Sequence, residues 1–212
     1  MYLSRVALDV RRRETMRALA RPTMLHGAIE QSFKGERKRR LWRIDQLDNT
    51  HFLLVLSEDQ PDFEFLNRQF GNTDGCNGWE IKSYSSFLER IEAKQVWRFR
   101  LCANPVHSVK EQGVTGRGKL FAHITREHQK KWLLDRSEKN GFSIQANNFD
   151  VIRSEWINFG KGIGKREEIS MCAVVYEGVL VVTDATRFCE ALVGGIGRGK
   201  AYGCGLLTVM RL

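Results

Sequence analysis

Five histidines are the side chains of this sequence best suited to proton transfer near neutral pH, because an unperturbed imidazole has a pKa of about 6.5. They are His26, His51, His107, His123 and His128. His123 and His128 are five positions apart, which is not the i,i+4 spacing of two metal ligands on one helix. We interpret them as ordinary residues beside a helix, in reach of a phosphate. His51 and His107 lie in strand-like stretches, which favours a structural or surface role. His26 lies in a strongly basic segment, but on the residues alone a packing role remains the simpler interpretation.

A glycine-rich segment at residues 194–205 is the strongest local motif. Gly194, Gly199 and Lys200 meet most of the nucleotide phosphate-loop pattern G-x-x-x-x-G-K-[ST]. Ala201, however, replaces the hydroxyl that binds magnesium, the segment follows a predicted helix, and too few residues follow it for a strand bearing a magnesium ligand. We therefore expect no nucleotide cofactor. Free backbone N–H groups beside Arg198 and Lys200 suit a phosphate of a nucleic-acid backbone, although a tight helix-to-strand turn explains the glycines equally well.

The charges of the chain are segregated along the sequence. Its 212 residues include 34 Lys+Arg and 25 Asp+Glu, a net charge of +9. Residues 1–43 hold 12 basic and 4 acidic side chains, residues 44–93 hold 3 and 10, and residues 94–212 hold 19 and 11. Two basic blocks indicate a polyanion-binding protein, because each neutralised phosphate releases counterions. A merely solvated basic surface is the alternative, but the arginine clusters at 11–13 and 37–40 favour nucleic acid.

Composition excludes several classes of protein. A content of 42% hydrophobic and 28% charged residues is typical of a globular chain. No apolar run approaches the ~18 residues that span a bilayer, and the alternating, charged N-terminus does not resemble a signal peptide. The five cysteines are odd in number and lack C-x-x-C spacing, which argues against a disulfide framework and a zinc site. We expect a reduced, cytoplasmic protein with no membrane partner and no bound metal.

Hydrophobic periodicity predicts the same succession of elements twice. The first half shows a strand at 2–10, a helix at 12–33 that is broken near Pro22, and strands at 38–47 and 50–57 across an Asp48-Asn49 turn. A short helix at 62–69, a glycine-rich loop at 71–78 and a strand at 79–83 follow. Pro22 suits the first turn of a second helical piece, because its missing N–H costs nothing there. Residues 84–94 form the predicted linker, with some helical character.

The second half repeats this order. It shows a strand at 95–103, a Gly/Lys loop at 110–119 and a helix at 126–139. Two strands at 150–159 and 168–183, joined by a glycine-rich hairpin, a helix at 185–193 and a strand at 204–211 follow. Thr125 and Asp184 are the predicted N-caps of its helices. The pattern predicts an α+β fold of two tandem ferredoxin-like (βαββαβ) domains, residues 1–90 and 95–212, with a groove between them, rather than one doubly wound sheet.

Four short motifs in this order carry a family resemblance: YLS behind Met1, FRLCANP at 99–105, YEGVL at 176–180, and GCGLL at 203–207. Together they resemble the repeat-processing endoribonucleases of type I-E CRISPR systems, the CasE subunits of Cascade, over essentially the whole chain. The resemblance implies two ferredoxin-like folds, a CRISPR repeat stem-loop RNA as substrate, other Cascade subunits as partners, and cleavage without metal or cofactor. It also implies attack of a ribose 2′-OH on the adjacent phosphorus, leaving a 2′,3′-cyclic phosphate and a 5′-OH.

The same resemblance assigns the catalytic role to His26, because the family places its histidine in this helix within a Leu-His pair, here Leu25-His26. Some members carry a tyrosine three residues earlier, where this chain has Thr23. The acid–base partner of His26 is therefore left open, with Ser32 and Lys34 as candidates by proximity alone.

RNA contacts are predicted on both halves of the chain. Lys161, Lys165 and Arg166 flank a hairpin tip that resembles the basic hairpin which the family lays along the repeat stem. The basic run Arg11, Arg12 and Arg13 is expected along the same groove, and Arg198 and Lys200 on the glycine loop. Two alternatives stay open: a non-catalytic RNA-binding subunit with the same fold, and, less favoured, a nucleotide-binding enzyme that uses the glycine loop.

Overall fold

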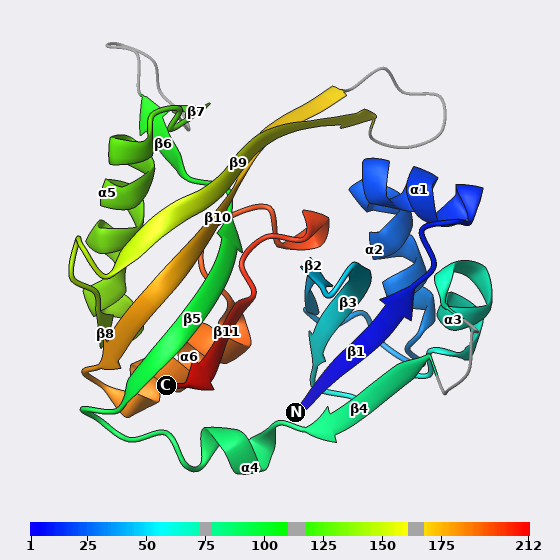
Figure 1. The fold of residues 1–212 in the computed structure, drawn as a ribbon, viewed down its shortest axis with the longest axis horizontal. Coiled ribbons are helices and arrows are strands. Elements are labelled where there is room, and N and C mark those ends of the chain that lie inside the picture. The colour runs from blue at the N-terminus through cyan, green and yellow to red at the C-terminus, as the bar shows by residue number, and fades with distance from the viewer. Residues whose placement is uncertain (73–77, 110–117, 161–167) are drawn as a thin grey trace.

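An antiparallel sheet backed by helices makes up the first half of the chain (Figure 1). The computed structural model describes residues 1–72, 78–109, 118–160 and 168–212. The elements of this half are β1 (Tyr2–Leu8), α1 (Arg13–Ala20), α2 (Pro22–Gln31), β2 (Leu41–Leu47), β3 (Thr50–Ser57), α3 (Glu64–Phe70) and β4 (Trp79–Ser83). The strand order β2-β3-β1-β4 is that of a ferredoxin-like βαββαβ unit, as predicted.

The second half builds the same unit with one insertion. After α4 (Ser85–Leu88) in the predicted linker come β5 (Val96–Ala103), β6 (Val106–Val109), β7 (Lys119–Ala122), α5 (Arg126–Ser137), η1 (Glu138–Asn140), β8 (Phe142–Ser143), β9 (Phe149–Gly160), β10 (Glu168–Val182), α6 (Ala185–Gly194), η2 (Lys200–Tyr202) and β11 (Leu207–Arg211). The main sheet has the order β11-β5-β10-β8, and β9 also pairs with β10. The prediction of two tandem ferredoxin-like domains is confirmed.

Most of the predicted Gly/Lys loop, residues 110–117, lies outside the described part of the chain, and the β6 and β7 strands that flank it form a hairpin that the sequence did not predict. One local prediction is wrong: the last strand begins at Leu207 rather than at residue 204. Gly203 and Gly205 have φ angles of 84° and 93°, a left-handed backbone that cannot continue a strand.

Helix starts follow the predicted signals. Pro22 occupies the first turn of α2, so the predicted break in the long helical segment is confirmed. The Thr125 side chain accepts a hydrogen bond from the backbone N–H of His128, and that of Asp184 accepts one from Arg187. Both residues are the N-caps that the sequence predicts. These caps fix where α5 and α6 begin, and therefore which of their faces meet the sheet.

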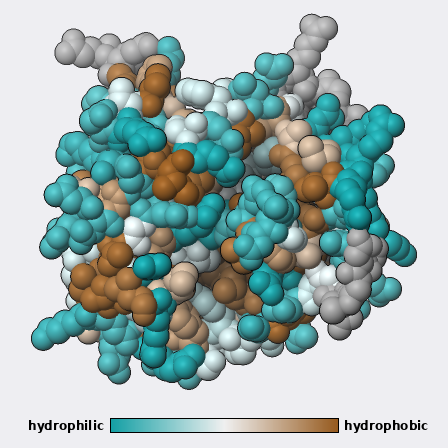
Figure 2. Space-filling view, viewed as in Figure 1, coloured by the Kyte–Doolittle hydropathy of each residue, from teal (hydrophilic) through white to brown (hydrophobic). Residues whose placement is uncertain are grey.

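Each domain has its own hydrophobic core between its sheet and its helices. In the first domain, Leu25 and Ile29 of α2 pack with Val6, Leu53 and Phe70. The core of the second domain includes the following buried side chains: Leu101, Trp132, Leu133, Val174, Tyr176, Phe188 and Leu192. Hydrophilic side chains predominate on the face seen in Figure 2, and the hydrophobic ones form separate patches there.

The two domains are joined by a buried arginine. The side chain of Arg43, on β2, is only 3% exposed and forms an ion pair with Asp45 at 2.6 Å. Across the domain boundary its guanidinium donates to the carbonyls of Arg100 and Leu206, at 2.9 and 2.8 Å, and to the hydroxyl of Thr208 at 2.7 Å. A polar clamp of this kind fixes the position of one sheet relative to the other.

Within the described ranges, no helix is both long and apolar enough to cross a membrane. Cys102, Cys172, Cys189 and Cys204 are free thiols.

Candidate functional site

His26 lies on α2, at the side of the first domain that faces the second. The helix buries Leu25, Ala28 and Ile29 in the core, three positions at the spacing of one helical face. At about 100° per residue, His26 lies between Pro22 and Thr23 around the helix axis. Each of these neighbours lines a different cavity between the domains, so the half-buried imidazole is placed at the edge of the groove.

Three charged side chains surround the imidazole. The guanidinium of Arg37 approaches His26 Nε2 at 2.8 Å. Glu30, one turn along α2, holds Arg37 at 3.2 Å and Arg40 at 2.8 Å through the same carboxylate oxygen. Arg40 is buried and lies over the ring of Phe33, 4.0 Å from its centroid. Glu30 thereby positions two arginines on the segment that follows α2.

The contact with Arg37 fixes the protonation state of His26. A guanidinium only donates hydrogen bonds, so Nε2 must accept, and the ring proton then lies on Nδ1. Burial lowers the pKa of His26, Glu30 acts in the opposite direction, and Arg37 and Arg40 lower it further. The imidazole is therefore neutral near pH 7. A neutral imidazole beside guanidinium groups is the combination that accepts a proton while neighbouring cations stabilise an anion.

Two hollows of the groove between the domains lie beside α2. One, of about 570 Å³, is lined by Thr23 and Met24 of α2 and by Asn158 and Glu168 from the far end of the β9–β10 hairpin. In Figure 1 this hairpin reaches over toward α1 and α2. The other, of about 230 Å³, includes Pro22 and Leu25 on one side and Arg153 and Glu155 of β9 on the other. His51, predicted to have a structural or surface role, also lines this second hollow.

The glycine loop supplies only one of its two cations to this side. Its short helix η2 packs against α2. Lys200 donates to the carbonyl of Gly194, and burial, followed by the nearby charge of Arg39, lowers the Lys200 pKa. Arg198 instead pairs through its backbone with Asn104, and its side chain lines a separate cavity of the second domain. The structure thus separates two residues that the sequence predicted together.

The remaining predicted residues lie as follows. The Arg11 guanidinium donates two hydrogen bonds to the Asp9 carboxylate, at 2.8 and 3.0 Å. Arg12 donates to the carbonyl of Arg68 at 2.7 Å. Arg13 is exposed in the first turn of α1. The predicted hairpin residues Lys161, Lys165 and Arg166 lie outside the described residues.

The two candidates for an acid–base partner differ in position. Ser32 is buried and donates its hydroxyl to the carbonyl of Ala28 at 3.1 Å, which makes it a helix-end residue. Lys34 is exposed on the segment after α2.

Two features of the structure are not predictable from the sequence. Arg37 stands out there only as part of a basic run, because the irregular segment that carries it has no periodicity to show where the side chain points. His107, His123 and His128 come together in the second domain, with successive ring centroids 4.7 and 5.9 Å apart. The first of them is far from the others in sequence, so no spacing rule brings it to them. In the described part of the chain, no group of three or more His, Cys, Asp or Glu side chains is arranged to hold a metal ion.

Two ferredoxin-like domains with a groove between them, and a histidine beside arginines at its edge, form an arrangement that suits chemistry on a phosphodiester. Comparison with known proteins gives the family. The family model described as "CRISPR associated protein" matches residues 1–211, and the chain belongs to that family. The resemblance to the CasE subunits predicted from the four motifs is confirmed.

Two curated relatives carry this assignment further. The CRISPR-associated endoribonuclease Cse3 of Thermus thermophilus is 28% identical over 228 aligned residues, which cover 99% of each chain. The CRISPR system Cascade subunit CasE of Escherichia coli is 31% identical over 120 residues, covering 54% of this chain and 57% of that protein. The chain is thus homologous to endoribonucleases of CRISPR systems.

Solved structures agree with the fold. A structure of the CRISPR endoribonuclease Cse3 bound to a 19-nucleotide RNA has a TM-score of 0.81 at 26% identity and covers 99% of this chain and 100% of that one. The Escherichia coli Cas6e structure has a TM-score of 0.61 at 22% identity and covers both chains fully. The second likeness supports the tandem fold.

Proposed function

We propose that this protein is a CRISPR precursor-RNA endoribonuclease that cuts the repeat stem-loop without a metal ion, with His26 as its catalytic residue. The observation that carries the proposal is the contact between His26 Nε2 and Arg37 at the edge of the interdomain groove. The relatives support the substrate class: a Thermus thermophilus Cse3 structure that is 25% identical holds an RNA representing a pre-cleavage complex.

The proposed reaction is a transesterification within the RNA. The ribose 2′-oxygen attacks the adjacent phosphorus, and its proton passes to the neutral Nε2 of His26. The bond between phosphorus and the 5′-oxygen breaks, and the leaving oxygen takes a proton from water. The hydroxide formed from that water takes the proton from His26, which returns to its neutral form. The products are a 2′,3′-cyclic phosphate and a 5′-OH, so no oxidant, reductant or cofactor is consumed. A group that transfers a proton in this way contributes roughly 10²–10⁴-fold to the rate.

Arg37 has a second role in this proposal. Its side chain is 72% exposed, so it can leave Nε2 when the 2′-OH arrives and move onto the scissile phosphate. There it offsets the extra negative charge that the pentacoordinate phosphorus acquires. Thr23 lies on the same side of α2, at the position where some family members carry a tyrosine. Its aliphatic hydroxyl is a far weaker acid than the phenol of a tyrosine. The chain therefore relies on His26 and on arginines rather than on a second proton donor.

The two domains have different tasks in the proposal. Residues 1–90 carry His26, and residues 95–212 bind the RNA stem. Lys161, Lys165 and Arg166, which the sequence predicts at a hairpin tip, contact the stem backbone. Arg11, Arg12 and Arg13 do so along the first domain, and Lys200 on the glycine loop. Shape and phosphate position guide this binding more than base identity, because the major groove of A-form RNA is too narrow to read.

The proposed product stays bound as the protein assembles with other Cascade subunits in the cytoplasm. The Escherichia coli relative is named a Cascade subunit, which supports this partner class. A product held in a basic groove by many phosphate contacts dissociates slowly at moderate salt.

Thr23 favours one alternative, a non-catalytic RNA-binding subunit with the same fold. The deciding experiment incubates wild type, His26→Ala and the control Lys139→Gln on η1 with a labelled cognate repeat RNA in EDTA. Cleavage by wild type and Lys139→Gln, with loss of cleavage but not of binding in His26→Ala, supports the nuclease. Binding without cleavage by all three proteins would support the alternative, and cleavage only after magnesium is restored would contradict metal independence.

A further inference from the structure

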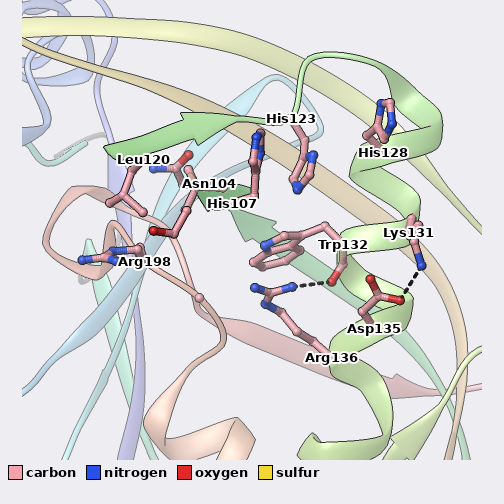
Figure 3. A pocket seen from close by; sticks show the side chains of 13 residues that line it. Asn104, His107, Leu120, His123, His128, Lys131, Trp132, Asp135, Arg136 and Arg198 are labelled. Atoms are coloured by element: carbon pink, nitrogen blue, oxygen red, sulfur yellow. Dashed lines mark hydrogen bonds and ion pairs between the residues drawn. The ribbon is translucent and has the colours of Figure 1, made fainter. Parts of the chain in front are cut away.

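A further polar cavity lies in the C-terminal domain, outside the groove beside His26. Its volume is about 580 Å³, and its walls come from α5, the β6–β7 hairpin and the glycine loop (Figure 3). The charged and hydrogen-bonding side chains that line it are Asn104, His107, Ser108, His123, His128, Lys131, Asp135, Arg136 and Arg198, together with Trp132. None of the proposed catalytic contacts uses these residues.

Three histidines form a row along one side of this cavity. His107 comes from β6, His123 from the turn after β7, and His128 from the first turn of α5. Their ring centroids are 4.7 and 5.9 Å apart in succession. His128 Nδ1 is 2.8 Å from the hydroxyl of Thr125, which holds its ring in place. An anion that enters the cavity beside these rings would stabilise a positive charge on them.

The fixed charges around the histidines are mostly positive. Lys131 forms an ion pair with Asp135 at 3.0 Å, so the charges of these two lining residues cancel. Arg136 and Arg198 give the cavity its excess of positive charge. Arg136 lies over the ring of Trp132, 4.2 Å from its centroid, and donates to the Trp132 carbonyl. Figure 3 shows Arg198 at the far edge of the cavity from α5. An anion that enters would meet donors from three directions.

Two buried polar atoms of the lining have no partner among the described residues. They are the indole nitrogen of Trp132, whose side chain is almost fully buried, and the side-chain oxygen of Asn104. A buried N–H without an acceptor costs about 1–3 kcal/mol, so native proteins rarely leave one unmatched. Because Trp132 lines the cavity, a ligand oxygen placed there would supply the missing acceptor.

We propose that this cavity binds a backbone phosphate of single-stranded RNA that continues from the cleaved stem-loop, and that binding is accompanied by proton uptake on the histidines. The proposal rests on the RNA-binding function proposed above. Concavity argues against a duplex, which needs an open surface. Exposed Leu120, Phe121 and Ile124 border the histidine row, and apolar or aromatic side chains beside cations are typical of sites for unstacked bases.

The glycine loop links this cavity to the groove. Arg198 faces the cavity, while η2, which begins two residues later at Lys200, packs against α2. Two residues span at most about 7 Å, so the backbones of Arg198 and Lys200 lie within that distance of each other. An RNA strand that leaves the groove past Lys200 therefore reaches the cavity within a few nucleotides.

The sign of the pH dependence follows from the row. Burial lowers the pKa of His123, and the neighbouring His107 and His128 lower it further. A bound phosphate reverses this, because it favours the charged imidazole. The pKa of the group is then higher in the complex than in the free protein, so protons are taken up and binding tightens as the pH falls. A change of one pKa unit in one histidine corresponds to about tenfold in affinity.

The test compares the affinity of the protein for three RNAs: the stem-loop alone, and the stem-loop with a single-stranded extension on its 5′ or its 3′ side. Fluorescence anisotropy at constant ionic strength gives each Kd at about pH 6 and pH 8. The ratio of the Kd values with and without extension cancels any pH effect of the His26 groove. The proteins are wild type, the triple variant His107→Gln, His123→Gln and His128→Gln, the milder Trp132→Phe, and the control Lys139→Gln on η1.

For wild type and Lys139→Gln, one of the two extensions should tighten binding, by about tenfold more at pH 6 than at pH 8. The triple variant should lose this gain, and Trp132→Phe should lose part of it at both pH values. Equal gains in wild type and the triple variant would overturn the proposal. So would variants that bind all RNAs normally but fail to assemble with a Cascade subunit, since the cavity would then bind protein. Failure of wild type to bind even the stem-loop would instead contradict the proposed function itself.

Discussion

Replacing Arg37 with glutamine tests the proposed chemistry most directly, because it removes the guanidinium that contacts His26 Nε2 and leaves α2 unchanged. A hydrogen bond that involves a charged group contributes about 1.5–3 kcal/mol, and loss of one donor to a developing anion costs about 2.7–4 kcal/mol. The Arg37 side chain is 72% exposed, so water screens its charge and the lower range applies. We therefore expect a loss of about 1.5–3 kcal/mol, or roughly 10–160-fold in the cleavage rate.

The pH profile gives a second readout, which a merely structural role of Arg37 would not change. His26 acts as a base only when neutral, so the rate should fall as the pH drops through the lowered pKa of His26 and level off above it. Arg37 is one cause of that lowering. Without it the pKa of His26 rises, and the acidic limb of the profile should move to higher pH.

Single-turnover cleavage of a labelled repeat RNA, measured from about pH 5 to pH 8, gives both quantities at saturating protein. Lys38→Gln is the matched control, because it removes a positive charge from the same segment. The Lys38 side chain pairs with Glu58 and Asp59 rather than with His26. Arg37→Lys keeps the charge and should give an intermediate rate. A cleavage rate of Arg37→Gln within about twofold of wild type, with an unmoved acidic limb, would refute the proposed role of Arg37.

Three further results are expected. Arg43→Met should lower the free energy of urea unfolding by about 3–5 kcal/mol, because it leaves buried partners at the domain boundary without a hydrogen bond. Arg5→Met, in an exposed ion pair, should lower it by less than about 1 kcal/mol. Equal losses would contradict the role of Arg43 as a clamp. Gly195→Ala should cost about 1–3 kcal/mol in the same assay, since its φ is 71° and a Cβ would meet the carbonyl of Gly205 at 2.8 Å; an unchanged unfolding curve would argue against this turn geometry. Lys165→Ala with Arg166→Ala should weaken RNA binding and flatten its salt dependence; unchanged affinity across a salt series would remove the hairpin from the interface.

Much of the fold could be predicted because local rules decide it. Pro22 breaks the helical segment, Thr125 and Asp184 cap their helices, and the two repeats of strand and helix order give the two sheets. The rules fail where the backbone must do something unusual. Alternation near the C-terminus suggested a strand from residue 204, but the left-handed glycines Gly203 and Gly205 postpone it to β11.

The candidate site was predictable only in part. The helix of His26 and its basic surroundings can be read from the sequence, whereas the partner of its imidazole cannot. Arg37 reaches His26 because Glu30 fixes it through an ion pair, a contact between side chains that no periodicity encodes. The separation of Arg198 from Lys200 has a similar cause: a glycine with positive φ stands between them, at residue 199, and turns the chain.

The buried position of Arg43 has a thermodynamic consequence for any ligand of the groove. Because the clamp ties β2 to two carbonyls and a hydroxyl of the second sheet, closing the groove by a hinge motion would require breaking several buried hydrogen bonds at once. The width of the groove is therefore set before a ligand arrives. The conformational entropy lost on association falls on the ligand, and a partner already folded into a stem pays least of it.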